Sequence, residues 1–184
     1  MTILLHVCCG PCATGIIQNL QQRGYLVTAL FYNPNIQPAA EKSRRLNSLN
    51  RYLAKIKIPL VIRDSHEKNF SAAIKNHPNP PERCLACYRL RLSEIARVVA
   101  EKNYDYFTTT LLGSPHQDIE AIKKIGGDLA QTYRVKFYAP ESGRKKFKGF
   151  RPVFAAGRKI AKDEHLYEQA YCGCLFSKEI SSHK

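Results

Sequence analysis

Residues 3–12 have the sequence Ile3-Leu4-Leu5-His6-Val7-Cys8-Cys9-Gly10-Pro11-Cys12. The part up to Val7 is a short, mainly apolar run, which is typical of a buried strand. Residues 13–23 have the pattern of a helix that ends at Gly24. Open α/β sheets bind their ligands at the carboxyl ends of strands, so the cysteines that follow this strand stand where a functional site is expected. They also stand near a helix start, where the helix dipole favours thiolates.

Strands and helices alternate along the rest of the chain. Further strands are predicted at residues 26–32, 59–62, 104–112 and 136–139. Helices are predicted at residues 39–56 and 84–102, and Ser114-Pro115 suits the cap and first residue of another, with Ile119, Ile122 and Ile125. Such repeated units predict an α/β three-layer sandwich with a mostly parallel sheet. No linker divides residues 1–184, so we expect a single domain with a metal site at the carboxyl ends of its strands.

Composition and charge narrow the class of protein. A chain of 184 residues with 44% hydrophobic residues can form a core without disulfides. We find no signal peptide and no run of the roughly 18–20 apolar residues that spans a membrane, so we expect a cytoplasmic protein without a membrane partner. Lys and Arg number 29 against 15 Asp and Glu, which gives a formal net charge of +14. This imbalance favours a nucleic acid as partner, with a generally basic surface as the alternative.

The seven cysteines fall into three short groups, Cys8-Cys9-Gly10-Pro11-Cys12, Cys84-Leu85-Ala86-Cys87 and Cys172-Gly173-Cys174. Thiols stay reduced in the cytoplasm, so metal binding or redox chemistry is the expected use. Soft thiolate ligands select iron–sulfur clusters, zinc or Cu(I). Two simpler interpretations remain open. One is a structural zinc site made by the second and third groups, and the other is a redox dithiol formed by Cys9 and Cys12.

Five segments carry a more specific resemblance, and they follow one another in order along nearly the whole chain. They are Leu4-Leu5-His6-Val7-Cys8-Cys9-Gly10-Pro11-Cys12, Tyr32-Asn33-Pro34-Asn35-Ile36-Gln37-Pro38 with Glu41 and Arg45, Arg83-Cys84-Leu85-Ala86-Cys87-Tyr88 with Arg91-Leu92, Thr108-Thr109-Thr110-Leu111-Leu112 with Ser114-Pro115-His116-Gln117-Asp118, and Tyr167-Glu168-Gln169-Ala170-Tyr171-Cys172-Gly173-Cys174-Leu175-Phe176-Ser177. Together they resemble the QueH family of epoxyqueuosine reductases. Two features depart from the family pattern: Lys146-Phe147-Lys148-Gly149 stands where an acidic residue is expected, and Cys12 stands where some members have Asp.

The resemblance implies a fold and a reaction. The fold is that of HUP, or adenine nucleotide alpha hydrolase-like, domains. The reaction is the last step of queuosine biosynthesis, in which epoxyqueuosine at the tRNA wobble position is reduced to queuosine without cobalamin. The family is associated with a [4Fe–4S] cluster beside a mononuclear iron. An electron donor, of unknown identity, completes the set of partners with the tRNA.

Seven thiolates divide into four plus three. We predict that the cluster is bound by Cys84, Cys87, Cys172 and Cys174, and the lone iron by Cys8, Cys9 and Cys12. Three protein ligands leave a coordination position for substrate. Asp118 is a candidate catalytic proton donor, and its alternative role is to complement the helix dipole.

Several other side chains have competing interpretations. For RNA, residues 144–151 interleave cations and aromatic rings, with Arg144, Lys145, Lys146, Lys148 and Arg151 as the predicted contacts, and a solvated loop is the alternative. Arg44, Arg45 and Arg51 extend that basic surface, although Glu41 and Arg45 also have the spacing of an ordinary surface ion pair. His6 is expected to be a core histidine.

Two other functions remain open on the sequence. The first is a zinc-stabilised RNA-binding module without catalysis. The second is another cysteine-dependent tRNA-modifying enzyme, such as a thiolase that uses ATP. The place of a pyrophosphate-binding loop after the first strand is taken by cysteines, which counts against ATP.

Overall fold

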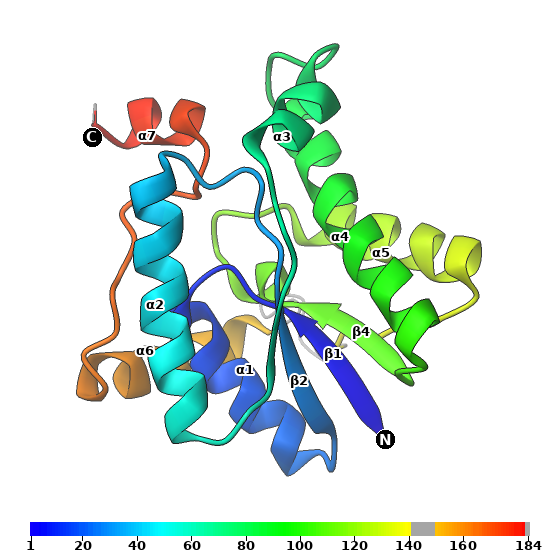
Figure 1. Cartoon of the computed structure of the whole chain (residues 1–184), viewed down its shortest axis with the longest axis vertical. Helices are drawn as coiled ribbons and strands as arrows, with labels where there is room; N and C mark the ends of the chain where they lie inside the picture. The colour runs from blue at the N-terminus through cyan, green and yellow to red at the C-terminus, as the bar shows by residue number, and fades with distance from the viewer. Residues whose placement is uncertain (141–149, 183–184) are drawn as a thin grey trace.

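The computed structural model describes residues 1–140 and 150–182 (Figure 1). Its centre is a five-stranded parallel sheet in the order β3-β2-β1-β4-β5. The strands are β1 (Thr2–His6), β2 (Leu26–Phe31), β3 (Leu60–Ile62), β4 (Tyr106–Thr109) and β5 (Lys136–Phe137). β1 is the middle strand, and Ile3, Leu4 and Leu5 are fully buried. Burial on both faces explains why this strand is a continuous apolar run rather than an alternating one.

Helices cover both faces of the sheet. On one side lie α1 (Gly10–Gln22), α2 (Ala39–Lys55) and α6 (Arg151–Asp163), and on the other lie α4 (Glu82–Lys102) and α5 (Ile119–Tyr133) (Figure 1). The short α3 (Glu67–Ile74) packs on α4, η1 (Thr110–Gly113) follows β4, and α7 (Leu175–Ser182) is the last described element. The predicted three-layer α/β sandwich is therefore confirmed. No helix in the described ranges has the length and apolarity that a membrane crossing requires.

The strand order creates a switch point in the middle of the sheet. From β1 the chain winds outward through β2 to β3, and it then returns to the other side of β1 to form β4 and β5. The connections after β1 and β4 leave the sheet in opposite directions, so a crevice opens beyond their carboxyl ends. The first cysteine group follows β1 directly, which places it at this crevice.

The packing of α6 against α1 depends on two glycines. A Cβ atom on Gly15 would overlap the carbonyl oxygen of Val153, and one on Gly157 would overlap the backbone of Gly15. Thr14 fixes the contact further, since its hydroxyl donates to the carbonyl oxygen of Gly157 at 2.8 Å. The sequence patterns did not predict α6, because small residues rather than a wide apolar stripe make its contact with α1.

Two predicted boundaries near β4 were wrong. The predicted strand 104–112 is only Tyr106–Thr109, because the chain turns into η1 at Thr110. The next helix is not capped by Ser114: α5 begins at Ile119, and the carboxylate of Asp118 accepts a hydrogen bond from the backbone N–H of Ala121 at 3.0 Å. Asp is as good a cap as Ser, so the local pattern alone did not separate the two.

Candidate metal centre

The first cysteine group forms a compact cluster of sulfur atoms at the end of β1. Cys9 is the N-cap of α1, and Cys12 lies in its first turn. The sulfur atoms of Cys8, Cys9 and Cys12 all lie within 4.8 Å of one another, and all three residues are buried. Cys9 and Cys12 are joined as a disulfide, and Cys8 Sγ lies 3.7 Å from Cys9 Sγ. Thiolates formed at this helix N-terminus would gain from the helix dipole.

The donor set of this cluster fits a single metal ion. Two thiolates bound to one tetrahedral ion at about 2.3 Å lie about 3.8 Å apart. The separation of the Cys8 and Cys9 sulfur atoms, 3.7 Å, agrees with that value. Cys9 and Cys12 must be reduced before both can act as ligands. The cluster is therefore compatible with a thiol-bound metal and also with a redox dithiol, and it contains a third sulfur that a dithiol does not need.

The second and third groups meet beside the first. Cys84 and Cys87 lie in the first turns of α4, and Cys172 and Cys174 lie in the turn before α7. The pKa of the Cys87 thiol is raised to about 11, mainly by burial, with the nearby thiols of Cys172, Cys174 and Cys84 adding to the rise and Arg91 opposing it. The thiol of Cys172 is also within electrostatic range of Cys8. The three cysteine groups, which are far apart in the sequence, thus lie near one another at the carboxyl ends of the strands.

The exposure of these thiols is uneven. Cys87 is buried, whereas Cys84 and Cys174 are partly buried. Cys172 is exposed, and its sulfur accepts a hydrogen bond from Gln117 Nε2 at 3.4 Å. Gln169 Nε2 makes a similar contact of 3.5 Å with Cys12 Sγ. Amide N–H groups aimed at sulfur favour the thiolate form over the thiol.

A buried ion pair holds the Cys172–Cys174 turn against α2. The guanidinium of Arg45 donates to the carbonyl oxygens of Cys172 at 3.0 Å and Tyr171 at 2.9 Å, and its Nε contacts Glu41 Oε1 at 2.7 Å. The second carboxylate oxygen of Glu41 accepts from the hydroxyl of Tyr167 at 2.7 Å. The ion pair suggested by the spacing is therefore present, but it is not on the surface, since Arg45 is only 1% exposed and Glu41 6%. The i,i+4 spacing correctly indicated that the two side chains can pair, but it could not indicate that the pair is buried.

Gly173 allows the turn to approach the loop after β2. Its φ of +145° lies in a region that side chains rarely adopt. A Cβ atom there would stand 2.9 Å from Asn35 Nδ2 and 3.1 Å from Ile36. The backbone N–H of Gln37 donates to the carbonyl oxygen of Gly173 at 2.9 Å. The Cys-Gly-Cys sequence thus suits a turn that is pressed against another segment.

Arg91, which lies in one of the five motif segments but was given no predicted role, is a buried cation beside the cysteines. It is 1% exposed, and its Nε donates to the carbonyl oxygen of Cys87 at 3.2 Å. Within the described residues its Nη2 has no hydrogen-bond partner. Electrostatic interaction reaches the thiols of Cys87, Cys172 and Cys8. An unpaired buried charge is costly, so this guanidinium is best satisfied when the surrounding sulfur atoms are anionic.

The chain is similar to known proteins over nearly its whole length. The family model described as Epoxyqueuosine reductase QueH matches residues 3–180. The chain belongs to this family. Among its curated members, the epoxyqueuosine reductase QueH of Dehalococcoides mccartyi is 32% identical over 96% of this chain and 92% of that protein. The QueH of Staphylococcus epidermidis is 33% identical over 95% of this chain and 75% of its own length. By family, this chain is an oxidoreductase that reduces epoxyqueuosine.

Solved structures support the fold at lower identity. The U34-tRNA thiolase NcsA from Methanococcus maripaludis, with its [4Fe-4S] cluster, aligns with a TM-score of 0.60 at 15% identity, over 100% of this chain and 65% of NcsA. A predicted subunit of tRNA methyltransferase from Methanocaldococcus jannaschii aligns with a TM-score of 0.54 at 14% identity, over 86% of this chain and 76% of its own. These likenesses confirm the HUP-like α/β fold of this QueH-family chain.

Two of the polar residues discussed from the sequence have structural roles. Asp118 caps α5, and its backbone N–H also lies 3.4 Å from the hydroxyl of Tyr88. Its catalytic role stays a prediction. His6 is the expected core histidine: it is fully buried, and burial lowers its pKa to about 3. Its Nε2–H donates to the carbonyl oxygen of Tyr32 at 3.1 Å, so its Nδ1 accepts from the hydroxyl of Thr109 at 2.9 Å.

The predicted RNA contacts are only partly described. Arg144, Lys145, Lys146 and Lys148 lie outside the described residues. Arg151 is the first residue of α6 and is partly buried. Of the arginines expected to extend the basic surface, Arg45 is buried, whereas Arg44 and Arg51 are exposed on α2.

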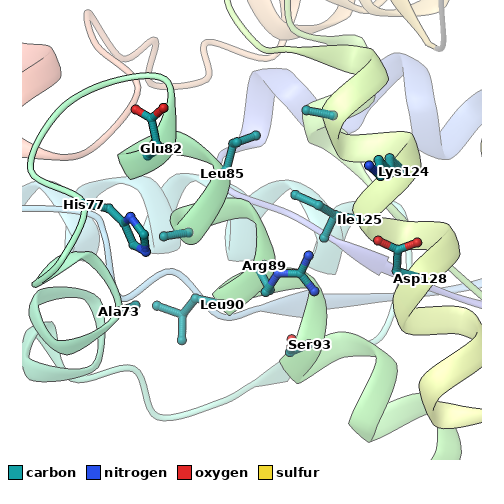
Figure 2. A pocket seen from close by; sticks show the side chains of 12 residues that line it. Ala73, His77, Glu82, Leu85, Arg89, Leu90, Ser93, Lys124, Ile125 and Asp128 are labelled. Carbon is teal, nitrogen blue, oxygen red and sulfur yellow. The ribbon is translucent and has the colours of Figure 1, made fainter.

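A separate cavity lies away from the cysteines. It has a volume of about 660 Å³ and lies among α3, α4 and α5, where Leu85, Arg89 and Ile125 are among the side chains that line it (Figure 2). Helical spacing puts Leu85 and Arg89 on the face of α4 opposite Cys84 and Cys87. None of the seven cysteines lines this cavity, so its size does not identify the reactive centre.

Proposed function

We propose that this chain reduces the epoxide of epoxyqueuosine at the wobble position of tRNA to give queuosine, with a [4Fe–4S] cluster and a mononuclear iron as cofactors. Family membership supports the reaction. The observation that carries the cofactors is the convergence of three cysteine groups beside a buried cation. Seven thiols in one place exceed what a single zinc ion uses, and they suit two adjacent iron centres.

The proposed division of ligands follows the elements that carry the cysteines. Cys8, Cys9 and Cys12 would hold the single iron, because their sulfur atoms share one small volume. The cluster would be held by Cys84, Cys87, Cys172 and Cys174, which come from α4 and from the turn before α7. A four-iron cluster keeps its thiolates farther apart than one ion does. Three ligands on the single iron would leave a position for the epoxide oxygen.

The reaction removes the epoxide oxygen as water and leaves a carbon–carbon double bond. It consumes two electrons and two protons. When bound, the cluster supplies electrons one at a time and the single iron polarises the epoxide oxygen. The side chains supply the rest. Arg91 lies buried among the thiols, where its positive charge favours the more reduced, more negative state. Asp118 and the nearby hydroxyl of Tyr88 are the proposed source of a proton.

The remaining elements of the proposal concern setting and partners. We place the protein in the cytoplasm, where thiols stay reduced and tRNA is present. The net charge of +14 suits a polyanionic substrate. The wobble base lies in the single-stranded anticodon loop, so its extrusion costs less than flipping a paired base. The electrons come from a donor of unknown identity, and residues 1–184 act as one domain.

The experiment is anaerobic turnover with a metal analysis of the same sample. The purified protein, with a chemical reductant, should convert epoxyqueuosine in tRNA to queuosine, as detected by mass spectrometry of the digested tRNA. Iron and acid-labile sulfide should be present together, and Cys84→Ala should lose the sulfide. Unchanged substrate with full iron and sulfide would refute the reaction. Turnover by an iron-free or zinc-only sample would refute the cofactors and favour the Cys9–Cys12 dithiol.

A further inference from the structure

A second concave site lies along α2, beside the segment that leads to the Cys172 turn. It has a volume of about 460 Å³, and it is formed by α2 and by the segment that follows α6. Its lining residues are all polar: Arg44, Asn47, Ser48, Arg51, His165 and Tyr167. No carboxylate is among them. The site therefore presents two guanidinium groups and no acidic side chain to the solvent. We refer to it as the arginine pocket.

The pocket is held in shape by contacts among its own residues. The guanidinium of Arg44 lies over the ring of Tyr167, 5.2 Å from its centroid. The backbone N–H of Tyr167 donates to Ser48 Oγ at 2.9 Å, and Arg51 Nη2 donates to the carbonyl oxygen of His165 at 3.0 Å. These contacts fix the segment that carries His165 and Tyr167 against α2. Both guanidinium groups therefore start from positions that are already ordered, which lowers the entropic cost of binding a ligand.

The charges of the pocket have no counter-ion in the described part of the chain. Neither Arg44 nor Arg51 forms an ion pair there. Two nearby carboxylates are engaged elsewhere: Glu41 by Arg45 and by the hydroxyl of Tyr167, and Glu164 by Lys55. Planar guanidinium groups bind phosphate in a bidentate manner, and amide, hydroxyl and imidazole groups add further hydrogen bonds. The chemistry of the pocket thus selects a phosphate group.

The pocket is close to the metal centre along the chain and in space. Tyr167 and Cys172 are five residues apart, so their Cα atoms are at most about 17 Å apart. Between them, Gln169 contacts Cys12 Sγ at 3.5 Å. Tyr167 is also joined through Glu41 to Arg45, which holds the Cys172 turn. A phosphate in the pocket would therefore lie a few nucleotides at most from a base held at the cysteines.

We propose that the arginine pocket binds a phosphodiester of the anticodon loop next to the nucleotide that is reduced. This inference rests on the proposed function, since it takes tRNA as the substrate. The phosphate fixes the position of the RNA backbone, while recognition of the modified base is left to the cysteine edge of the sheet.

The test measures binding of an unmodified tRNA transcript with a wobble guanosine, so it needs no turnover. Arg44→Gln should weaken binding roughly tenfold through loss of a charge-assisted phosphate contact. The slope of log K against log salt should become less steep by about 0.7 to 0.9. Arg44→Gln with Arg51→Gln should weaken binding roughly a hundredfold if the two contacts are independent. Iron content and circular dichroism of each variant should match those of the parent protein.

Arg23→Gln is the matched control, because Arg23 is an exposed arginine at the end of α1 and does not line the pocket. Its affinity and salt slope should equal those of the parent protein. Equal losses for Arg23→Gln and Arg44→Gln would show a diffuse charge effect and overturn the proposal, as would an unchanged salt slope in the double variant. If tRNA binding follows the expected pattern while anaerobic turnover fails, the result supports the role of the pocket and refutes the proposed reaction.

Discussion

Replacing Arg45 by Met tests the claim that a buried ion pair positions the Cys172–Cys174 turn. The variant keeps most of the side-chain volume and removes the charge. It leaves the Glu41 carboxylate buried with only the Tyr167 hydroxyl as a partner, and it leaves the carbonyl oxygens of Tyr171 and Cys172 without their donor. Removing one partner of a buried pair typically costs about 3–5 kcal/mol.

We therefore expect the free energy of unfolding to fall by about 3–5 kcal/mol, a large part of the 5–15 kcal/mol of an ordinary domain. The turn should also lose its order, so acid-labile sulfide should fall with the loss of Cys172 and Cys174 as ligands. The assay is urea unfolding under anaerobic, reducing conditions, with sulfide analysis of the same preparation. Arg44→Met is the control for stability, because exposed side chains usually contribute within about 0.5 kcal/mol.

Arg45→Lys covers the case in which the Met variant does not fold. Lys keeps the charge that faces Glu41, but one ammonium group cannot reach the carboxylate and two carbonyl oxygens in the planar arrangement of a guanidinium. It should be more stable than Arg45→Met and still lose sulfide. A loss of less than about 1 kcal/mol in Arg45→Met, or full sulfide in both variants, would refute the role of this residue.

Three further changes follow from the same structure. Gly173→Ala should lower sulfide content and destabilise the protein by about 1 kcal/mol or more, because the φ of +145° and the contact with Asn35 both disfavour a Cβ atom; parent-like sulfide would contradict this. Gly15→Ala should lower the melting temperature by forcing α6 off α1, whereas Gly127→Ala, in open space on α5, should raise stability by up to about 1 kcal/mol. Arg91→Gln should lower the reduction potential of the bound cluster, on the order of 59 mV for a tenfold change in a one-electron equilibrium. A redox titration followed by electron paramagnetic resonance measures this potential. An unchanged potential would show that the buried charge of Arg91 does not tune the cluster.

Much of the sheet could be predicted from short patterns. The apolar run ending at Val7 located β1, and the predicted strand 26–32 matches β2, whereas α1 begins at Gly10, three residues before the predicted helix 13–23. These features follow local rules, since strand burial and helix starts are written in adjacent residues. The same rules failed around β4 and α5, where Ser114 and Asp118 are equally suitable caps. Only the packing of the helix against its neighbours selected Asp118.

The sequence alone determined which chemistry is available: three cysteine groups, a strongly basic surface and an ordered set of motifs shared with one family. Only the tertiary structure decided which other side chains are buried close to the cysteines and support them. Arg45 and Arg91 belong to the family motifs, but the sequence did not show a structural role for either; both are buried, one holding a turn from beyond residue 170 and the other lying among the thiols. Burial depends on contacts between segments far apart in the chain, and no local pattern records them.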